Sequence, residues 1–213
     1  MNIRLVSSEE YPVRDDLPLK VAVFFVEGIK VEKNSVIYKE IGKLAEKYKN
    51  EYQDIPIGSI PGVQDVRVLF RALGLDPTKR RPSSESLLRR AIKGKEFYSI
   101  NNLVDIGNLI SLKHLLPVCI YDSAKIIGDV EIRLGRVGES YLALNKSIID
   151  FQGRIVYADA DGPFGSPMTD SVKTSITDST TSAFCQILAP INYSEIELQK
   201  LRDEFIGLVQ LFC

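Results

Sequence analysis

The pattern of apolar residues predicts a buried strand followed by an amphipathic helix near the start of the chain. Residues 19–29, LKVAVFFVEGI, are rich in β-branched and aromatic side chains, which suit the pleated surface of a sheet. In residues 35–52 apolar positions then recur at steps of four, three and four, namely Ile37, Ile41, Leu44 and Tyr48. This spacing places them on one helical face, with Lys and Glu over the rest of the surface.

The same period predicts two more helices before residue 95. Residues 63–74 carry one apolar stripe that stops at a glycine. Residues 76–95 read as a loop that leads into a helix, with Ser83 or Ser84 as its N-cap and Gly94 as its C-cap.

Helices are also expected in the middle and at the end of the chain. Residues 100–122, INNLVDIGNLISLKHLLPVCIYD, do not alternate strictly, so we expect a helix through their middle that Pro117 ends. The last residues, SEIELQKLRDEFIGLVQLF, carry apolar side chains at helical spacing, with Ser194 as the N-cap.

Strands are predicted mainly in the second half. Residues 128–144 and 153–162 are short runs bounded by glycines, and residues 180–190 form an apolar run before a proline. Helices that precede strands, rather than alternate with them, indicate an α+β fold. We expect one domain over residues 1–213, because no low-complexity linker divides the chain.

Composition and charge narrow the classes of function. Hydrophobic residues at 45% and charged residues at 26% are ordinary globular values. The net charge of −1 gives no general attraction to nucleic acid or membranes, so DNA binding is not expected and any RNA must bind at a local cluster. No apolar run of 18 residues and no signal-like start occur, which favours the cytoplasm.

Metal and cofactor chemistry is not expected from this sequence. The three cysteines are widely spaced without a CxxC pair, and His114 is the only histidine. Cys119 would act as a nucleophile only with a base nearby, and His114, five residues upstream, is the sole candidate. The alternative is that Cys119 is a small buried hydrophobic residue.

Two segments are candidates for binding. Seven of the 27 basic residues fall between positions 79 and 95, and five of them are predicted RNA contacts: Arg80, Arg81, Arg89, Arg90 and Lys93. The alternative is a solvated helix surface. Residues 170–182, DSVKTSITDSTTS, could line a polar pocket or form a turn-rich loop whose side chains bond their own backbone.

Residues 100–122 resemble the signature of the B3/B4 domain in the β-subunit of bacterial phenylalanyl-tRNA synthetase. In that signature Asn-x-x-Val-Asp-x-x-Asn is followed by Pro-x-x-x-aromatic-Asp. The matching positions here are Asn101 or Asn102, Val104, Asp105, Asn108, Pro117, Tyr121 and Asp122. The resemblance is specific over about residues 80–190 and is closer to free-standing B3/B4 proteins, with residues 1–75 and the closing helix 194–212 as appended elements.

In the synthetase this domain hydrolyses the ester of tyrosine mischarged on phenylalanine tRNA. The resemblance therefore implies a three-layer β/β/α arrangement, a β-sandwich of unusual topology flanked by helices, and a water-mediated reaction without a metal. It also implies that polar side chains converge on one hollow large enough for an amino acid. The predicted catalytic or pocket residues are Asn102, Asn108, Cys119, Lys173, Thr174 and Thr177.

Departures from the family pattern affect the expected chemistry. Cys119 stands where the synthetase motif commonly has His, Gly107 where it has Thr, and Gln186 where the editing pocket has Glu. The family's glycine-rich loop is replaced by PMTDSVKTS. Editing specific for tyrosine therefore does not carry over.

These observations predict a stand-alone B3/B4 module that binds tRNA or an aminoacyl-tRNA-like ligand, with hydrolysis of the aminoacyl ester in trans as the expected enzymatic activity. Two alternatives stay open, a non-catalytic binding protein for a small amino-acid-like ligand and a scaffold for protein contacts. Nothing corresponds to the other domains of the synthetase, so the chain is not a complete aminoacyl-tRNA ligase.

Overall fold

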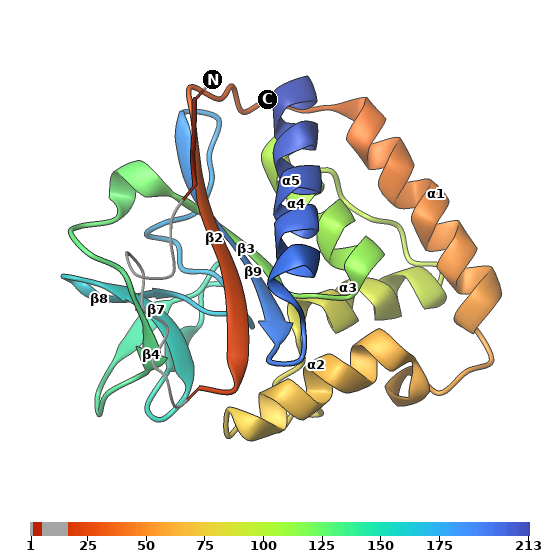
Figure 1. Ribbon diagram of the computed structural model, residues 1–213, viewed down its shortest axis with the longest axis horizontal. Coiled ribbons are helices and arrows are strands. Elements are labelled where there is room, and N and C mark those ends of the chain that lie inside the picture. The colour runs from red at the N-terminus through yellow and green to blue at the C-terminus, as the bar shows by residue number, and fades with distance from the viewer. Residues whose placement is uncertain (1, 6–16) are drawn as a thin grey trace.

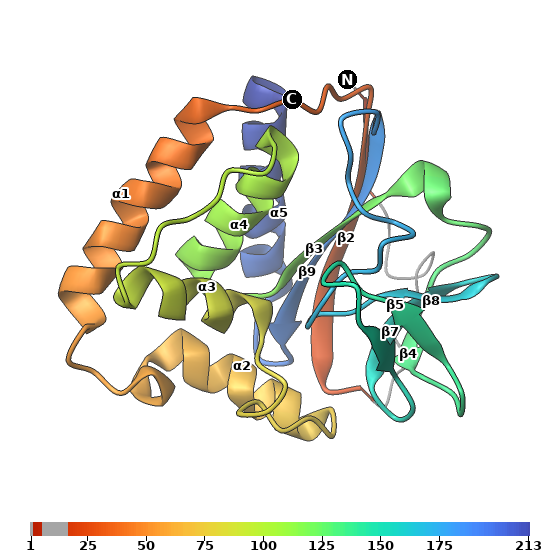
Figure 2. The ribbon, with the colours of Figure 1, turned by 180° about the vertical axis from the view of Figure 1, so that it is seen from behind.

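The computed structural model describes residues 2–5 and 17–213, and it arranges them in three layers (Figures 1 and 2). A helical layer covers one face of a four-stranded sheet, and smaller sheets cover the other face. The helices are α1 (Ser35–Tyr52), α2 (Pro61–Ala72), α3 (Ser83–Ile92), α4 (Asn102–His114) and α5 (Glu195–Phe212). The α+β class and the three-layer arrangement predicted from the sequence are confirmed.

The main sheet has the order β1-β2-β9-β3 and is antiparallel throughout. Its strands are β1 (Asn2–Leu5), β2 (Leu19–Glu27), β3 (Val118–Asp122) and β9 (Ser182–Pro190). Strand β9 lies in the interior of the sheet, and every residue from Ala183 to Pro190 is buried. A strand covered on both faces needs an almost continuous apolar sequence, which AFCQILAP provides except at Gln186.

Alternation along these strands assigns each side chain to one face of the sheet. Phe24 packs edge-on against Phe205 of α5, with ring centroids 5.2 Å apart, so this face meets the helices. Ile120 lies on the same face, where an added Cβ on Gly107 of α4 would stand 2.5 Å from its Cδ1 atom. Glycine at position 107 therefore lets α4 approach the sheet closely.

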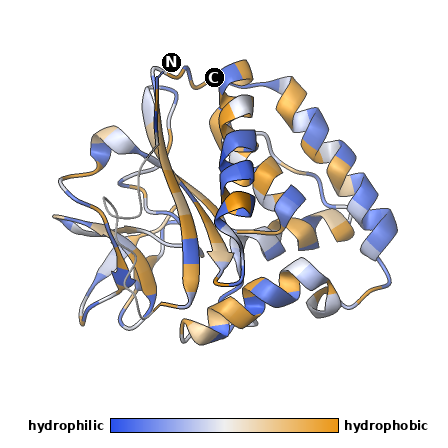
Figure 3. Cartoon of the chain, viewed as in Figure 1, coloured by the Kyte–Doolittle hydropathy of each residue, from blue (hydrophilic) through white to orange (hydrophobic). Residues whose placement is uncertain are grey.

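The third layer consists of a three-stranded sheet, β4-β7-β8, and a two-stranded sheet, β5-β6. The strands are β4 (Glu131–Leu134), β5 (Ser140–Leu142), β6 (Ile148–Asp150), β7 (Ile155–Asp159) and β8 (Gly162–Gly165). Tyr157 and Ile155 of β7 belong to the large core shared with the main sheet, whereas Val156 and Ala158 belong to a smaller outer core. Strand β7 is thus buried on both sides. Figure 3 shows that the long central strands are coloured mainly as hydrophobic, whereas hydrophobic and hydrophilic residues alternate along the helices.

The structure differs from the sequence-based prediction at several places: strands β6 and β8 were not predicted, α2 begins and ends two residues earlier than expected, and residues 82–84 and 115–122 also differ. Residues 118–122 form strand β3, which the pattern did not indicate, and α4 already ends at His114 because Leu115 adopts a left-handed conformation with φ of 56°. The prediction of Ser83 or Ser84 as an N-cap was wrong. Pro82 occupies that position without a side-chain cap, and Ser83 is the first helical residue.

Asn102 fastens α4 to two distant segments of the chain. Its side-chain Oδ1 accepts hydrogen bonds from the backbone N–H of Glu32 at 3.0 Å and of Leu103 at 2.9 Å. Its Nδ2 donates to the carbonyl oxygens of Lys30 at 2.8 Å and Phe212 at 2.7 Å. All four capacities of this buried amide are used, so its role is structural.

We expect Asn102→Ala to lower the free energy of unfolding by about 2–4 kcal/mol, because it leaves several buried backbone groups without partners. The measurement is urea denaturation followed by circular dichroism. Asn108→Ala is the matched control. Asn108 lies half-buried on the same helix, and its side chain makes no hydrogen bond within the described residues, so a change in unfolding free energy below about 0.5 kcal/mol is expected. Equal losses of stability in the two variants would contradict this structural role of the Asn102 hydrogen bonds.

Candidate functional site

A cluster of polar side chains is enclosed between the main sheet and the third layer. Cys119 of β3 and Gln186 of β9 are register partners, and Tyr121 pairs with Phe184 two residues further along. Register partners point to the same face, and Tyr121 contacts Tyr157 of β7 with ring centroids 5.7 Å apart. The face that carries Cys119, Tyr121 and Gln186 is therefore the one turned toward the third layer.

Gln186 is the least satisfied side chain of this cluster. It is fully buried, and neither its Nε2 nor its Oε1 has a hydrogen-bond partner among the described residues. An unpaired buried amide costs about 1–3 kcal/mol, so such groups are rare in cores. Gln186 thus offers both donors and an acceptor to a ligand.

Tyr121 presents a second unpaired group in the same space. Its hydroxyl is buried and has no partner with acceptable hydrogen-bond geometry in the described part of the chain. Gly165 of β8 makes room for it, because a Cβ at that position would stand 2.3 Å from the Tyr121 hydroxyl. A glycine is therefore required here for packing against the ring rather than for a turn.

Asp170 is the carboxylate of the cluster. It is partly exposed and interacts electrostatically with Cys119, Tyr121, Tyr141 and Tyr157. Burial raises the pKa of Asp170 to about 6, and the nearby Tyr121 hydroxyl opposes that rise without forming a well-oriented hydrogen bond. Among the described residues no Lys, Arg or His neutralises this carboxylate, which makes the site acidic above pH 6.

Cys119 is not built as a nucleophile. Burial raises the pKa of its thiol far above the usual range, and its Sγ lies 3.8 Å from the Tyr157 hydroxyl and from the Ser166 carbonyl oxygen. His114 is bonded instead to Glu204 of α5, with Nε2 and Oε2 2.9 Å apart. Because His114 contacts the helical layer and Cys119 faces the third layer, the Cys–His dyad considered from sequence is contradicted.

The six predicted pocket residues do not come together. Asn102 and Asn108 lie on α4, in the helical layer on the opposite side of the main sheet from Cys119. Thr174 is buried and donates from Oγ1 to the Phe164 carbonyl oxygen at 3.0 Å. Thr177 is exposed, and its Oγ1 lies 2.9 Å from Ser179 Oγ. The expected single hollow between residues 101 and 177 is therefore not formed by these side chains.

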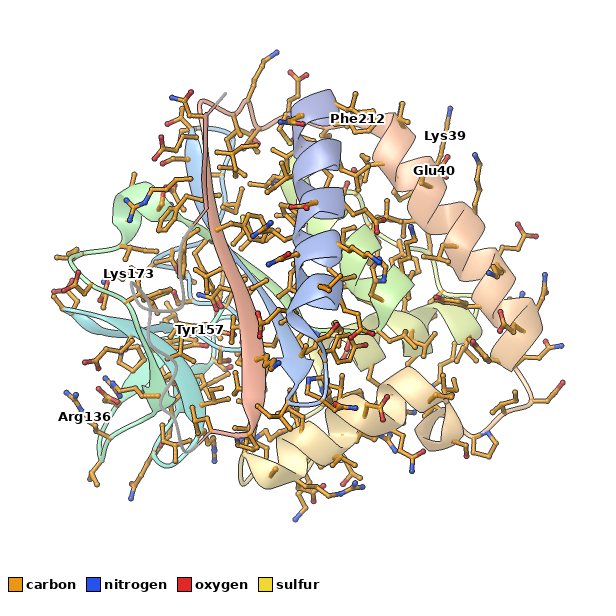
Figure 4. The ribbon with its side chains drawn as sticks, viewed as in Figure 1. Lys39, Glu40, Arg136, Tyr157, Lys173 and Phe212 are labelled. Carbon is orange, nitrogen blue, oxygen red and sulfur yellow. The ribbon has the colours of Figure 1, made fainter. Side chains whose placement is uncertain are left out.

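Lys173 lies on the third layer (Figure 4) and is exposed, whereas Tyr157 is buried. Its Nζ binds Asp159 Oδ2 at 3.0 Å and Asp161 Oδ2 at 3.2 Å. These bonds, and the bond from Ser175 Oγ to the Val172 carbonyl oxygen, agree with the turn-rich interpretation of residues 170–182. The member of that segment that reaches the cluster is Asp170.

The predicted RNA contacts lie on and beside α3, in the helical layer. Glu85, itself buried, binds Arg67, Arg81 and Arg89 at 2.7, 3.6 and 2.8 Å. Arg90 donates to the Glu96 carbonyl oxygen and lies 4.8 Å from the Tyr98 ring centroid. Arg80 and Lys93 are exposed and have no side-chain partner within residues 17–213. Only part of the basic cluster is thus available for phosphate.

Surface hollows occur elsewhere on the described part of the chain. One of 540 Å³ lies on the third layer among paired charges that include Arg133, Glu139 and Asp159. One of 640 Å³ lies between α1, α4 and α5, and one of 390 Å³ between α1 and α3, near Lys39 (Figure 4). None of the three is lined by Cys119 or Gln186. No described helix combines the length and apolarity that a membrane crossing requires.

Fold and site together define an α+β domain with a polar cluster enclosed between two β-layers. A family model described as the B3/4 domain matches residues 65–199, more than half of the chain. The chain therefore belongs to the B3/4 domain family. This match includes the stretch of residues 80–190 on which the sequence resemblance rested.

The chain is similar to part of the β-subunit of phenylalanine–tRNA ligases. It is 38% identical over 77 residues to the subunit of Chromobacterium violaceum, and the aligned region covers 36% of this chain and 10% of that subunit. It is 35% identical over 86 residues to that of Brucella abortus, covering 40% and 11%. The similar region thus spans about a tenth of these relatives.

A solved structure, an N-terminal fragment of the phenylalanyl-tRNA synthetase β-subunit from Pyrococcus horikoshii, is also similar. It has a TM-score of 0.47 and 12% sequence identity, and the alignment covers 98% of this chain and 52% of the fragment.

Sequence reasoning missed Asp170, Tyr121, Tyr141 and Tyr157 as site residues. Gln186 was noted only as a departure from the family pattern. A usable signal existed for Gln186, because one polar residue within the apolar run AFCQILAP is unexpected in a central strand. Asp170 had no such signal, since it is one of many polar residues in its segment.

We expect Asp170→Asn to be more stable than the unchanged protein at pH 7.5, by about 1–3 kcal/mol, and equally stable at pH 3.5. The ordinary pKa of 3.8 rises to about 6 on folding, so ionisation opposes folding. This cost is absent below pH 3.8, grows between pH 3.8 and 6, and is complete above pH 6. Urea denaturation at both pH values tests it, and a constant difference between them would contradict the buried, unneutralised carboxylate.

Proposed function

We propose that this chain is a B3/4 module that binds the aminoacyl end of a tRNA and hydrolyses its ester. The observation that carries the proposal is the buried, unpaired amide of Gln186, which shares one face of the main sheet with Cys119 and Tyr121. Polar groups left unpaired inside a core destabilise the fold, and a polar ligand that pairs with them removes that penalty. Membership of the B3/4 family supports an aminoacyl ester as that ligand.

The proposed reaction uses water and no covalent enzyme intermediate. The Nε2 hydrogens of Gln186 and the hydroxyl of Tyr121 act as donors to the ester carbonyl oxygen, which gains negative charge as water attacks the carbonyl carbon. The water oxygen forms a bond to the carbonyl carbon, the bond from that carbon to the ribose oxygen breaks, and one proton of the attacking water passes to the ribose oxygen. The carboxylic acid that forms loses its remaining proton to solvent. The products are the free amino acid and uncharged tRNA. The protonated state of the Cys119 thiol fits this route, because the thiol is a poor nucleophile.

Release of amino acid from a panel of correctly and incorrectly charged tRNAs tests the proposal. The unchanged protein is expected to release at least one amino acid above the uncatalysed rate. Gln186→Leu is expected to slow that release by at least about tenfold while raising stability by about 1 kcal/mol, since it removes catalytic donors and an unsatisfied amide together.

Asp178→Asn is the control for that panel. Asp178 is exposed, lies in the segment 170–182 that precedes β9, and has no partner among the described residues. It should release amino acid at the unchanged rate. If no charged tRNA is hydrolysed, the enzymatic proposal fails.

A second candidate function is non-catalytic binding of an amino-acid-like ligand. Its support is the pair Cys119 and Gln186, neither of which titrates near neutral pH in this environment, where the family pattern has His and Glu. Stabilisation of the protein by a free amino acid, without any hydrolysis of charged tRNA, would favour this function over the first.

Exposed basic residues of the helical layer are proposed to bind tRNA phosphates. Removing Arg80 and Lys93 together should weaken tRNA binding about threefold to tenfold at low salt and reduce the salt slope by about one to two, because each phosphate contact releases a counterion. Filter binding across a salt series measures this. A Lys146→Ala, Lys200→Ala double variant removes the same charge from other exposed positions and should bind as the unchanged protein does.

A further inference from the structure

We propose that Asp170 and the aromatic rings around it form a binding site for a primary ammonium group, so that the site accepts α-amino esters and amides with a free amino group and rejects N-acylated ones. This inference rests on the proposed function for the identity of the ester, and it adds the residue and the charge that select the ligand. Three features of the cluster support it: the charge of Asp170, the aromatic rings near it, and the unpaired donors of Gln186 and Tyr121.

Among the described residues, the carboxylate of Asp170 has no cation of its own. Asp170 forms a β-bridge with Gly165, whose missing Cβ makes room for the Tyr121 hydroxyl, and the Tyr141 hydroxyl donates to the carbonyl oxygen of the preceding Thr169. Burial raises the pKa of Tyr121, Tyr141, Tyr157 and Cys119, so the groups around this carboxylate are neutral at pH 7. A partly buried carboxylate is costly unless a positive charge pairs with it. A cationic ligand supplies this charge, whereas a hydroxyl group supplies only a hydrogen bond.

The nearest lysine along the chain is committed elsewhere. Lys173 lies three residues after Asp170, yet its ammonium bonds Asp159 and Asp161 at the edge of the third layer. The ammonium group of Lys173 is therefore paired with these two carboxylates rather than with Asp170. A cationic group of a ligand can therefore pair with Asp170.

Aromatic rings complete a surface that suits an ammonium group. The Tyr121 ring lies 5.1 Å from Phe164 and 5.7 Å from Tyr157, and Phe164 lies 6.5 Å from Tyr157, measured between centroids. Electron-rich ring faces attract cations, and this attraction strengthens when water is excluded. Two of these three rings are tyrosines that interact directly with the Asp170 charge.

The unpaired groups set the orientation of such a ligand. An α-amino ester or amide carries its carbonyl one carbon away from its ammonium group, and Gln186 and Tyr121 provide donors for that carbonyl. Ammonium at Asp170 and carbonyl at Gln186 would then satisfy both features of the site at once. Acylation of the amino group removes its positive charge, so the carboxylate of Asp170 would stay unpaired. It also adds an acyl group at a position where the site is closed by side chains.

The test uses alaninamide, serinamide, valinamide and tyrosinamide, each compared with its N-acetyl form, because amides present the same groups without being hydrolysed. At least one free amide should raise the thermal midpoint by a few degrees, about 2–5 °C at saturating concentration, and its N-acetyl form should not. In Asp170→Asn the shift should disappear, while Asp178→Asn should keep it. Circular dichroism confirms that each variant is folded.

Two results would overturn the inference: no shift with any free amide, or equal shifts with the free and N-acetyl forms. In parallel, hydrolysis of an aminoacyl-tRNA should exceed that of its N-acetylaminoacyl counterpart by at least about tenfold, and Asp170→Asn should reduce this preference to below about threefold. Hydrolysis of both forms at equal rates would leave the deacylase proposal standing and refute the ammonium site. Amide binding that depends on Asp170, without tRNA hydrolysis, would support the ammonium site and refute the deacylase proposal.

Discussion

The pairing of β9 between β2 and β3 is the constraint on which the rest of the structure depends. Strand β9 is hydrogen-bonded along its whole length to β2 and along five residues to β3. This register sends Phe24, Ile120 and Cys185 toward the helices and Cys119, Tyr121 and Gln186 toward the third layer. A shift by one residue would exchange the two sets and bury the polar groups against the helical layer.

The two faces of this sheet have different tasks. On the helical side, Asn102 uses all its hydrogen-bonding capacity and Asp105 accepts bonds from Ser99 and Ile100, so these two buried residues are satisfied and structural. On the other side, Gln186 and Tyr121 are unsatisfied, and Asp170 has no cation among the described residues. The contacts of Asn102 and Asp105 therefore stabilise the fold on the helical face, whereas the unpaired groups on the other face destabilise it. This distribution is expected when one side of a core is kept for a ligand.

The replacement of the family's His and Glu by Cys119 and Gln186 acquires a physical meaning in this arrangement. The two residues are register partners, so both departures from the pattern that the resemblance implies fall at one place on the sheet. Asp170, which belongs to a different segment, supplies a carboxylate to the same cluster.

The sequence by itself determined the helices, most strands, the α+β class and the family, because apolar periodicity and local motifs are properties of short segments. Residues 35–52, for example, form the predicted helix without any shift of its ends. It did not determine strand β3, whose five residues are too few to show a period, or the site. Asp170, Tyr157 and Gln186 come from three segments, and only the packing of the third layer on the main sheet brings them together. Tertiary structure also separated Asn102 and Asn108 from Cys119, since α4 and the cluster lie on opposite faces of one sheet.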